Sequence, residues 1–186
     1  MSHNNDNWRS DDLTFYVDFE TIGSILLNSS QKTKLDIEGD YIFMIGVGWK
    51  CPEDEQWQYN SLYVNQITLI EEKRIIKEFN NLILNLEDKY KTNAKVIHWS
   101  NAEKSFYNKV NLRYGNIFKN INWFDLLRFF KDNNILILDS LNFSLKSIAT
   151  SMYKYGLIQS IWNNEITSGS DAMFFSCLLY TSPSPR

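Results

Sequence analysis

Residues 15–21 constrain the fold more than any other segment, because they combine the pattern of a β-strand with two carboxylates. Side chains alternate between the two faces of a strand, so Asp18 and Glu20 point to one face and the apolar side chains beside them to the other. Neighbouring carboxylates in an apolar strand repel each other and lose solvation, and a hard cation such as Mg²⁺ or Mn²⁺ relieves both effects. The alternative is a strand that runs into a solvated turn, with both acids simply exposed.

Composition excludes several classes of protein. The chain has 186 residues, of which 44% are hydrophobic and 15% aromatic, which predicts one globular domain with a substantial core. A net charge of −3 excludes a strongly basic nucleic-acid binder but allows a local basic groove beside an acidic centre. Two cysteines predict neither a disulfide framework nor a zinc site. The polar N-terminus and the lack of a long apolar run lead us to expect a cytoplasmic protein with no membrane partner.

Apolar periodicity predicts an α/β fold. We expect strands over residues 13–20, 41–49, 57–64 and 95–99, and a strand that passes into a helix over 122–131. Further helices are expected over 68–90, 102–113 and 144–155, with a last helix from 168 or 170. Short links between the first three strands favour an antiparallel meander, followed by parallel strands. This order, with acids at strand ends, is that of a ribonuclease H-like fold: a mixed five-stranded sheet flanked by helices.

Four motifs resemble, in this order, those of the DEDD exonuclease superfamily, and more narrowly those of the ribonuclease H-like domain attached to predicted RecB-family nucleases and helicases. They are Asp-Phe-Glu-Thr at 18–21, His-Trp-Ser-Asn-Ala-Glu-Lys at 98–104, Phe-Asp-Leu-Leu at 124–127 and Asn-Phe-Ser-Leu-Lys-Ser-Ile at 142–148. The resemblance spans residues 15–175. It implies a 3′–5′ exonuclease that hydrolyses single-stranded DNA or RNA with two Mg²⁺ or Mn²⁺ ions.

The resemblance also implies a set of acidic metal ligands. The first two fall on Asp18 and Glu20, the third on Glu103 and the fourth on Asp171. The third is usually an aspartate in the superfamily, so the longer Glu103 side chain is a departure. Asp125 matches an acid of the Asp-Leu-Leu motif and is a further candidate ligand.

Several of these residues have an alternative role that is purely structural. Glu103 could close the capping box of its own helix over residues 100–103, and Asp125 could cap the helix that begins after it. Asp171 could be a first-turn acid that favours the helix dipole. His98 is a candidate general base, or a hydrogen-bonded histidine of the core.

The general base is a second departure from the superfamily. Its members usually carry His or Tyr four or five residues before the last ligand, where this chain has Ile166 and Thr167. An alternative function follows, namely a catalytically inactive ribonuclease H-like module that binds nucleic acid or docks a nuclease or helicase partner.

Substrate contacts are expected from Lys146, Asn142 and Trp99, with the lysine near phosphate and the indole stacked on a base. Lys104 and Arg128 are looser candidates for phosphate contacts. Each of these cations could equally belong to a solvated surface, and the indole to the core.

The domain organisation has three parts. Residues 1–12 are expected to form a disordered N-terminus and residues 13–176 the ribonuclease H-like domain. The last ten residues, 177–186, resemble the translation of a transposase-type sequencing adapter, a contaminant of metagenomic assemblies. We therefore expect the natural chain to differ after residue 176 and to continue, with a nuclease or helicase domain as a candidate.

Overall fold

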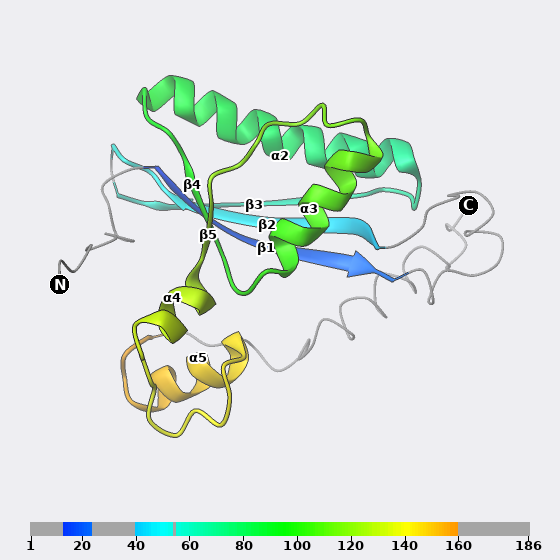
Figure 1. Cartoon of the computed structure of the whole chain (residues 1–186). Helices are drawn as coiled ribbons and strands as arrows, with labels where there is room; N and C mark the ends of the chain where they lie inside the picture. The colour runs from blue at the N-terminus through cyan, green and yellow to red at the C-terminus, as the bar shows by residue number, and fades with distance from the viewer. Residues whose placement is uncertain (1–12, 24–39, 54, 160–186) are drawn as a thin grey trace, which may run out of the picture.

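The computed structural model describes residues 13–23, 40–53 and 55–159 (Figure 1). The expected disordered N-terminus, the last helix with Asp171 and the adapter-like tail all lie outside these residues. The described elements are β1 (Thr14–Ile22), β2 (Tyr41–Lys50), β3 (Trp57–Tyr63), α2 (Leu69–Tyr90), β4 (Lys95–His98), α3 (Ala102–Arg113), β5 (Trp123–Asp125), α4 (Leu126–Asp132) and α5 (Leu145–Lys154).

The five strands form one mixed sheet in the order β3-β2-β1-β4-β5. β1 pairs antiparallel with β2, and β2 antiparallel with β3, whereas β4 runs parallel to both β1 and β5. The predicted α/β, ribonuclease H-like architecture is thereby confirmed. β1 continues two residues beyond its predicted end, because a register shift after Glu20 lets Thr21 and Ile22 keep pairing with β2.

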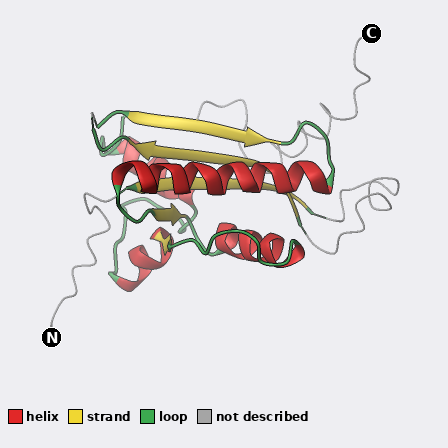
Figure 2. Ribbon diagram, turned by 90° about the horizontal axis from the view of Figure 1, so that it is seen from above, coloured by secondary structure: helices red, strands yellow, loops and turns green. Residues whose placement is uncertain are grey.

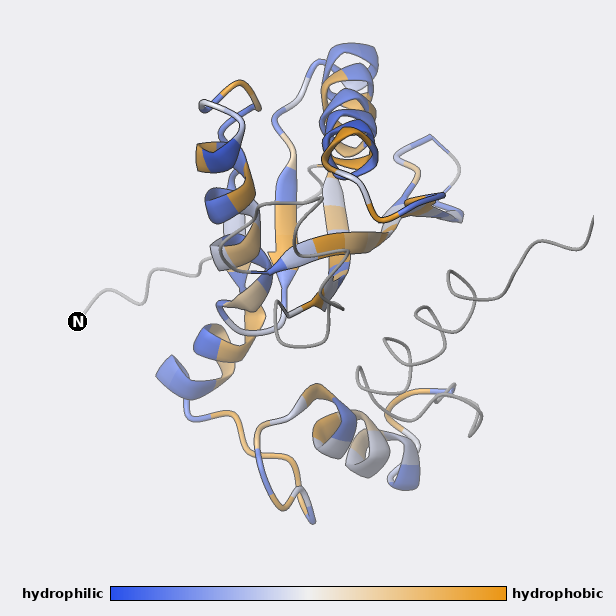
Figure 3. Ribbon diagram, turned by 90° about the vertical axis from the view of Figure 1, so that its right-hand side faces the viewer, coloured by the Kyte–Doolittle hydropathy of each residue, from blue (hydrophilic) through white to orange (hydrophobic). Residues whose placement is uncertain are grey.

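Helices α2 and α3 cover one face of the sheet. α2 runs along the strands it covers (Figure 2), and its apolar stripe buries Ile75, Ile76, Phe79 and Ile83. The Thr68 side chain begins this helix by accepting a hydrogen bond from the Glu71 backbone N–H at 3.3 Å, as its capping-box sequence predicts. The apolar strands lie beneath both helices, and the segment with α4 and α5 lies on the opposite side of the sheet (Figure 3).

The core is aromatic where β1 meets the helices. The Phe19 ring packs edge-on against Phe79 of α2 and Trp123 of β5, with centroids 5.7 Å and 6.3 Å away. Phe15 and Phe19 are both buried, and Val17 lies between them on the same face. The intervening side chains of β1 must therefore point to the face away from α2 and α3. Among the described helices, none combines the length and the apolar character that a bilayer-spanning segment requires.

Candidate metal centre at the ends of β1 and β4

Asp18 and Glu20 project from the central strand of the sheet, on the face opposite α2 and α3. Their partners on β2 are Gly46 and Met44, so neither carboxylate has a bulky branched neighbour across this pair. β4 runs parallel to β1, with Tyr16 paired to Ile97, so the carboxyl ends of the two strands meet at one edge. The residues that follow β4 are thus brought to the two acids, as the motif order predicted.

The electrostatics of β1 show that three carboxylates share this edge. Desolvation raises the pKa of Asp18, and the negative charge of Glu103 raises it further. Desolvation, followed by the charge of Asp18, raises the pKa of Glu20 to about 7. Asp18 is exposed to solvent, and Glu20 is half-buried. The fold therefore holds like charges together in a partly dehydrated position, which favours a bound cation.

Glu103 and His98 form the buried part of this edge. Only 8% of Glu103 and 2% of His98 are exposed, and His98 Nδ1 lies 3.5 Å from Glu103 Oε2. The same Nδ1 is hydrogen-bonded to the carbonyl oxygen of Ser100. Glu103 Oε2 and His98 Nε2 are buried without a hydrogen-bond partner in the described part of the chain. Buried polar atoms normally find partners, so the unpaired carboxylate oxygen of Glu103 is a candidate ligand for an ion.

The capping role considered for Glu103 has no support in this geometry. The residue that caps α3 is Asn101, whose side chain makes no capping hydrogen bond. Ser100 has φ of 74°, in the left-handed region, rather than the extended conformation of an N-cap. The hydrogen bond from His98 to Ser100 holds this turn, so the sequence of a capping box is present without its structure.

Asp125 has the structural role that was considered as its alternative. It lies at the end of β5, paired with His98, and its side chain accepts a hydrogen bond from the Arg128 backbone N–H at 3.0 Å. It caps α4 in this way. The cap uses one carboxylate oxygen, so a ligand role through the other oxygen stays a prediction.

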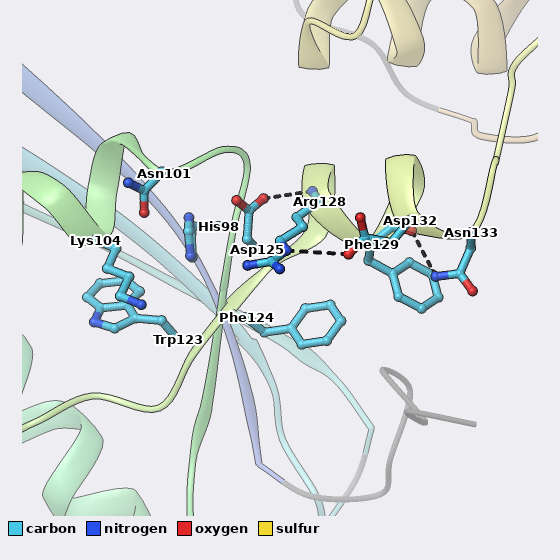
Figure 4. Close-up of a pocket in the computed structure, with 10 residues that line it drawn as sticks. All are labelled: His98, Asn101, Lys104, Trp123, Phe124, Asp125, Arg128, Phe129, Asp132 and Asn133. Carbon is cyan, nitrogen blue, oxygen red and sulfur yellow. Dashed lines mark hydrogen bonds and ion pairs between the residues drawn. The ribbon is translucent and has the colours of Figure 1, made fainter. Parts of the chain in front are cut away.

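A cavity of about 490 Å³ lies between the start of α3 and α4, next to this edge (Figure 4). Lys104 and Arg128, the looser candidates for phosphate contacts, lie on opposite sides of it. Arg128 Nε also forms an exposed ion pair with Asp132 at 3.3 Å, which is weak at a surface. The lining residues are His98, Asn101, Lys104, Trp123, Phe124, Asp125, Arg128, Phe129, Asp132 and Asn133.

The predicted substrate residues are associated with α4 and α5. Trp99 Nε1 donates to the Phe143 carbonyl at 3.0 Å, and the indole ring packs edge-on against Phe130, so Trp99 holds this segment against β4. Asn142 Oδ1 accepts from the Ser144 backbone N–H at 2.9 Å, and Lys146 is exposed in the first turn of α5. Figure 1 places α5 on the side of the sheet away from α2, the side toward which Asp18 and Glu20 point.

The chemistry of these donors suits a hard divalent cation, because they offer carboxylate oxygens and one of them is buried without a partner. Within residues 13–23, 40–53 and 55–159, no three His, Cys, Asp or Glu side chains are arranged to hold one ion. The fourth implied ligand, Asp171, lies outside the described residues.

Comparison with known proteins adds no identification. No protein-family model matches the chain, and no curated protein matches it. Inferences about function therefore rest on the residues and the geometry.

The sequence interpretation assigned no function to one set of residues, the exposed aromatic side chains of β3. Their alternation along the strand was the signal, but only the pairing with β2 places them on the face of Asp18 and Glu20.

Proposed function

We propose that this domain is a metal-dependent phosphodiesterase, a 3′–5′ exonuclease of single-stranded DNA or RNA. The observation that carries the proposal is the approach of Asp18, Glu20 and Glu103 to one edge of the sheet, where desolvation and then like charge raise the pKa of the first two. A protein that gathers acids in this way without a cation loses stability, which favours a functional role over a structural one.

Asp18, Glu20 and Glu103 would hold Mg²⁺ or Mn²⁺, with Asp171 as the fourth ligand that the motif order implies. Such ions supply activation of water and stabilisation of the leaving oxygen in phosphodiester hydrolysis. The exposed side of Asp18 gives a phosphodiester access to the centre, whereas the buried Glu103 is fixed by its surroundings.

His98 fits the role of a positioning residue better than that of a general base. Its Nδ1–H donates to the Ser100 carbonyl, which orients the ring and fixes the turn that leads into Glu103. The other ring nitrogen, Nε2, is buried. A base must be within reach of the attacking water, so a buried ring is better suited to orienting a ligand.

The test is hydrolysis of a labelled single-stranded oligonucleotide in the presence of Mn²⁺. Asp18→Asn, which keeps the size of the side chain, should reduce the rate at least 100-fold with an unchanged circular dichroism spectrum. Asp88→Asn is the matched control, because this exposed acid pairs with Lys91 at the end of α2. Equal rates for Asp18→Asn and wild type would refute the proposal. Oligonucleotide binding by the wild type without turnover would favour the alternative, an inactive module that binds nucleic acid or docks a partner.

A further inference from the structure

The face of the sheet that carries Asp18 and Glu20 also carries a group of large aromatic side chains. Strand pairing places them there, because residues paired across a sheet point to the same face. Asp18 pairs with Gly46, which pairs with Ser61; Tyr16 pairs with Gly48, which pairs with Tyr59. By the same register Trp57 and Tyr63 share this face. We call these four side chains the aromatic platform: Tyr16, Trp57, Tyr59 and Tyr63.

Three of the four side chains of the aromatic platform, those on β3, are mostly exposed to solvent, whereas Tyr16 is half-buried. The exposed fractions are 63% for Trp57, 71% for Tyr59 and 59% for Tyr63. Aromatic side chains normally bury most of their surface, so three neighbours on one strand with more than half exposed are unusual for a structural role. Their amphipathic rings are suited to contact with a partner that offers flat, partly apolar surfaces.

Two glycines in β2 form the floor of the aromatic platform. Gly48 lies between Tyr16 and Tyr59, and the absence of a side chain there lets rings from β1 and β3 approach each other. The Tyr16 and Trp57 rings lie 5.3 Å apart with an interplanar angle of 55°. A Cβ atom on Gly46 would lie 3.0 Å from Tyr59 Oη, so this ring leans over the glycine toward the strand of Asp18. Because Gly46 and Gly48 have no side chains, the aromatic rings of β1 and β3 project above β2 on this face.

The charges on this face are separated along the strands. Asp18 and Glu20 lie toward the carboxyl end of β1, while Lys50 and Lys95 lie at the other end, paired with Trp57 and Thr14. From the level of Thr14 to that of Asp18 is about 13 Å, at roughly 3.3 Å per residue. Lys50 pairs with Glu55, but both partners are exposed, so a phosphate can compete for the ammonium.

We propose that the aromatic platform binds the bases of single-stranded nucleic acid. Lys50 and Lys95 would lie near its phosphate backbone, and its 3′ end would lie at Asp18 and Glu20. This inference rests on the proposed function and assigns the contact with the bases of its single-stranded substrate to the aromatic platform. Base stacking on aromatic rings is tolerant of sequence and requires unstacked bases, which a duplex does not offer.

The experiment measures binding of a labelled oligonucleotide of about 15 nucleotides by fluorescence anisotropy, with EDTA present so that hydrolysis does not interfere. Tyr59→Ala and Tyr63→Ala should each weaken binding about tenfold, while Tyr59→Phe, which keeps the ring, should bind within about twofold of wild type. Leu84→Ala is the matched control, because this apolar side chain is 45% exposed but lies on α2, which covers the opposite face of the sheet. A duplex of the same length should compete poorly.

The possible results separate this inference from the proposed function. Wild-type affinity of Tyr59→Ala and Tyr63→Ala overturns the inference, even where the wild type hydrolyses the oligonucleotide. Weakened binding by both variants, with no Mn²⁺-dependent hydrolysis by the wild type, supports the inference and refutes the proposed function. A change in sedimentation or thermal midpoint with unchanged binding assigns the face to a second copy or to the chain itself, and also overturns the inference.

Discussion

His98 Nδ1 lies 3.5 Å from Glu103 Oε2 at the carboxyl end of β4, and both side chains are almost completely buried. The same nitrogen is hydrogen-bonded to the Ser100 carbonyl, so one ring connects the strand, the turn and the first carboxylate of α3. His98 therefore orients the turn that leads into Glu103, five residues further along the chain.

This relationship predicts the effect of replacing the ring. His98→Ala should lower kcat about 10- to 100-fold through misplacement of Glu103, as removal of an orienting partner commonly does. His98→Asn, whose amide N–H can still donate to Ser100, should recover most of the loss. If His98 were the general base, the Asn variant would be as inactive as the Ala variant, and the pH profile would lose a limb.

Glu20 predicts how the stability of the metal-free protein depends on pH. Its folded pKa of about 7 lies above its ordinary value of 4.5, so the folded state binds more protons between these values. The free energy of unfolding should therefore fall as pH rises from about 4.5 to 7 and level off above. Glu20→Gln should weaken this dependence, leaving the part due to the raised pKa of Asp18, and stabilise the metal-free protein by about 1 kcal/mol above pH 7, after allowance for solvent screening. Urea denaturation across this range measures both effects, and a stability that rises over the interval would contradict the assignment.

Cation binding should offset the loss of stability that the ionised acids cause in the metal-free protein. Mn²⁺ at about 100 times its dissociation constant should stabilise the wild type by about 2.7 kcal/mol, seen as a higher thermal midpoint. Binding should strengthen as pH rises through about 7, because the raised pKa of Glu20 keeps this ligand protonated below that value. Glu103→Gln should abolish most of the shift, and Asp88→Asn should retain it. An equal shift in all three proteins would indicate binding elsewhere.

The packing of α2 and α3 against each other depends on a buried ion pair. Arg113 Nη1 of α3 lies 2.6 Å from Oε2 of the fully buried Glu72 of α2, whose Oε1 accepts from the Ile42 backbone N–H at 2.9 Å. Removing one partner leaves a buried charge without compensation, so Arg113→Met should cost about 3 kcal/mol in urea denaturation. Tyr114, whose hydroxyl also donates to Glu72, limits the loss.

A matched comparison separates this effect from a general loss of side-chain packing. Lys109→Met changes a cation on the same helix whose side chain is 59% exposed and 3.5 Å from Asp40. It should alter stability by less than about 0.5 kcal/mol. A similar loss in both variants would refute the special role of the pair.

Local pattern was sufficient to predict most of the fold. The apolar periodicity of α2, its Thr68 cap and the alternation of β1 depend on neighbours in sequence, and the structure has each of them. The end of β1 was misplaced, because the register shift after Glu20 depends on β2 rather than on β1 itself.

The candidate site depends on contacts that spacing along the sequence cannot predict. The spacing of Ser100 and Glu103 fits both a capping box and a ligand position, and only the left-handed turn held by His98 distinguishes them. Likewise, the alternation of β3 predicts that Tyr59 and Tyr63 share a face. Which face they share depends on pairing with residues of β2 more than ten positions away.

The central place of β1 has a consequence for the order in which this protein assembles. Its antiparallel pairing with β2 is a local event that a nascent chain can complete early. Its parallel pairing with β4 joins residues about 80 positions apart, Tyr16 and Ile97, and must wait for the long crossover through α2. The acids of β1 are thus synthesised first but meet Glu103 only after that slow closure, so a growing chain on the ribosome cannot form the proposed cation site before β4 has paired with β1.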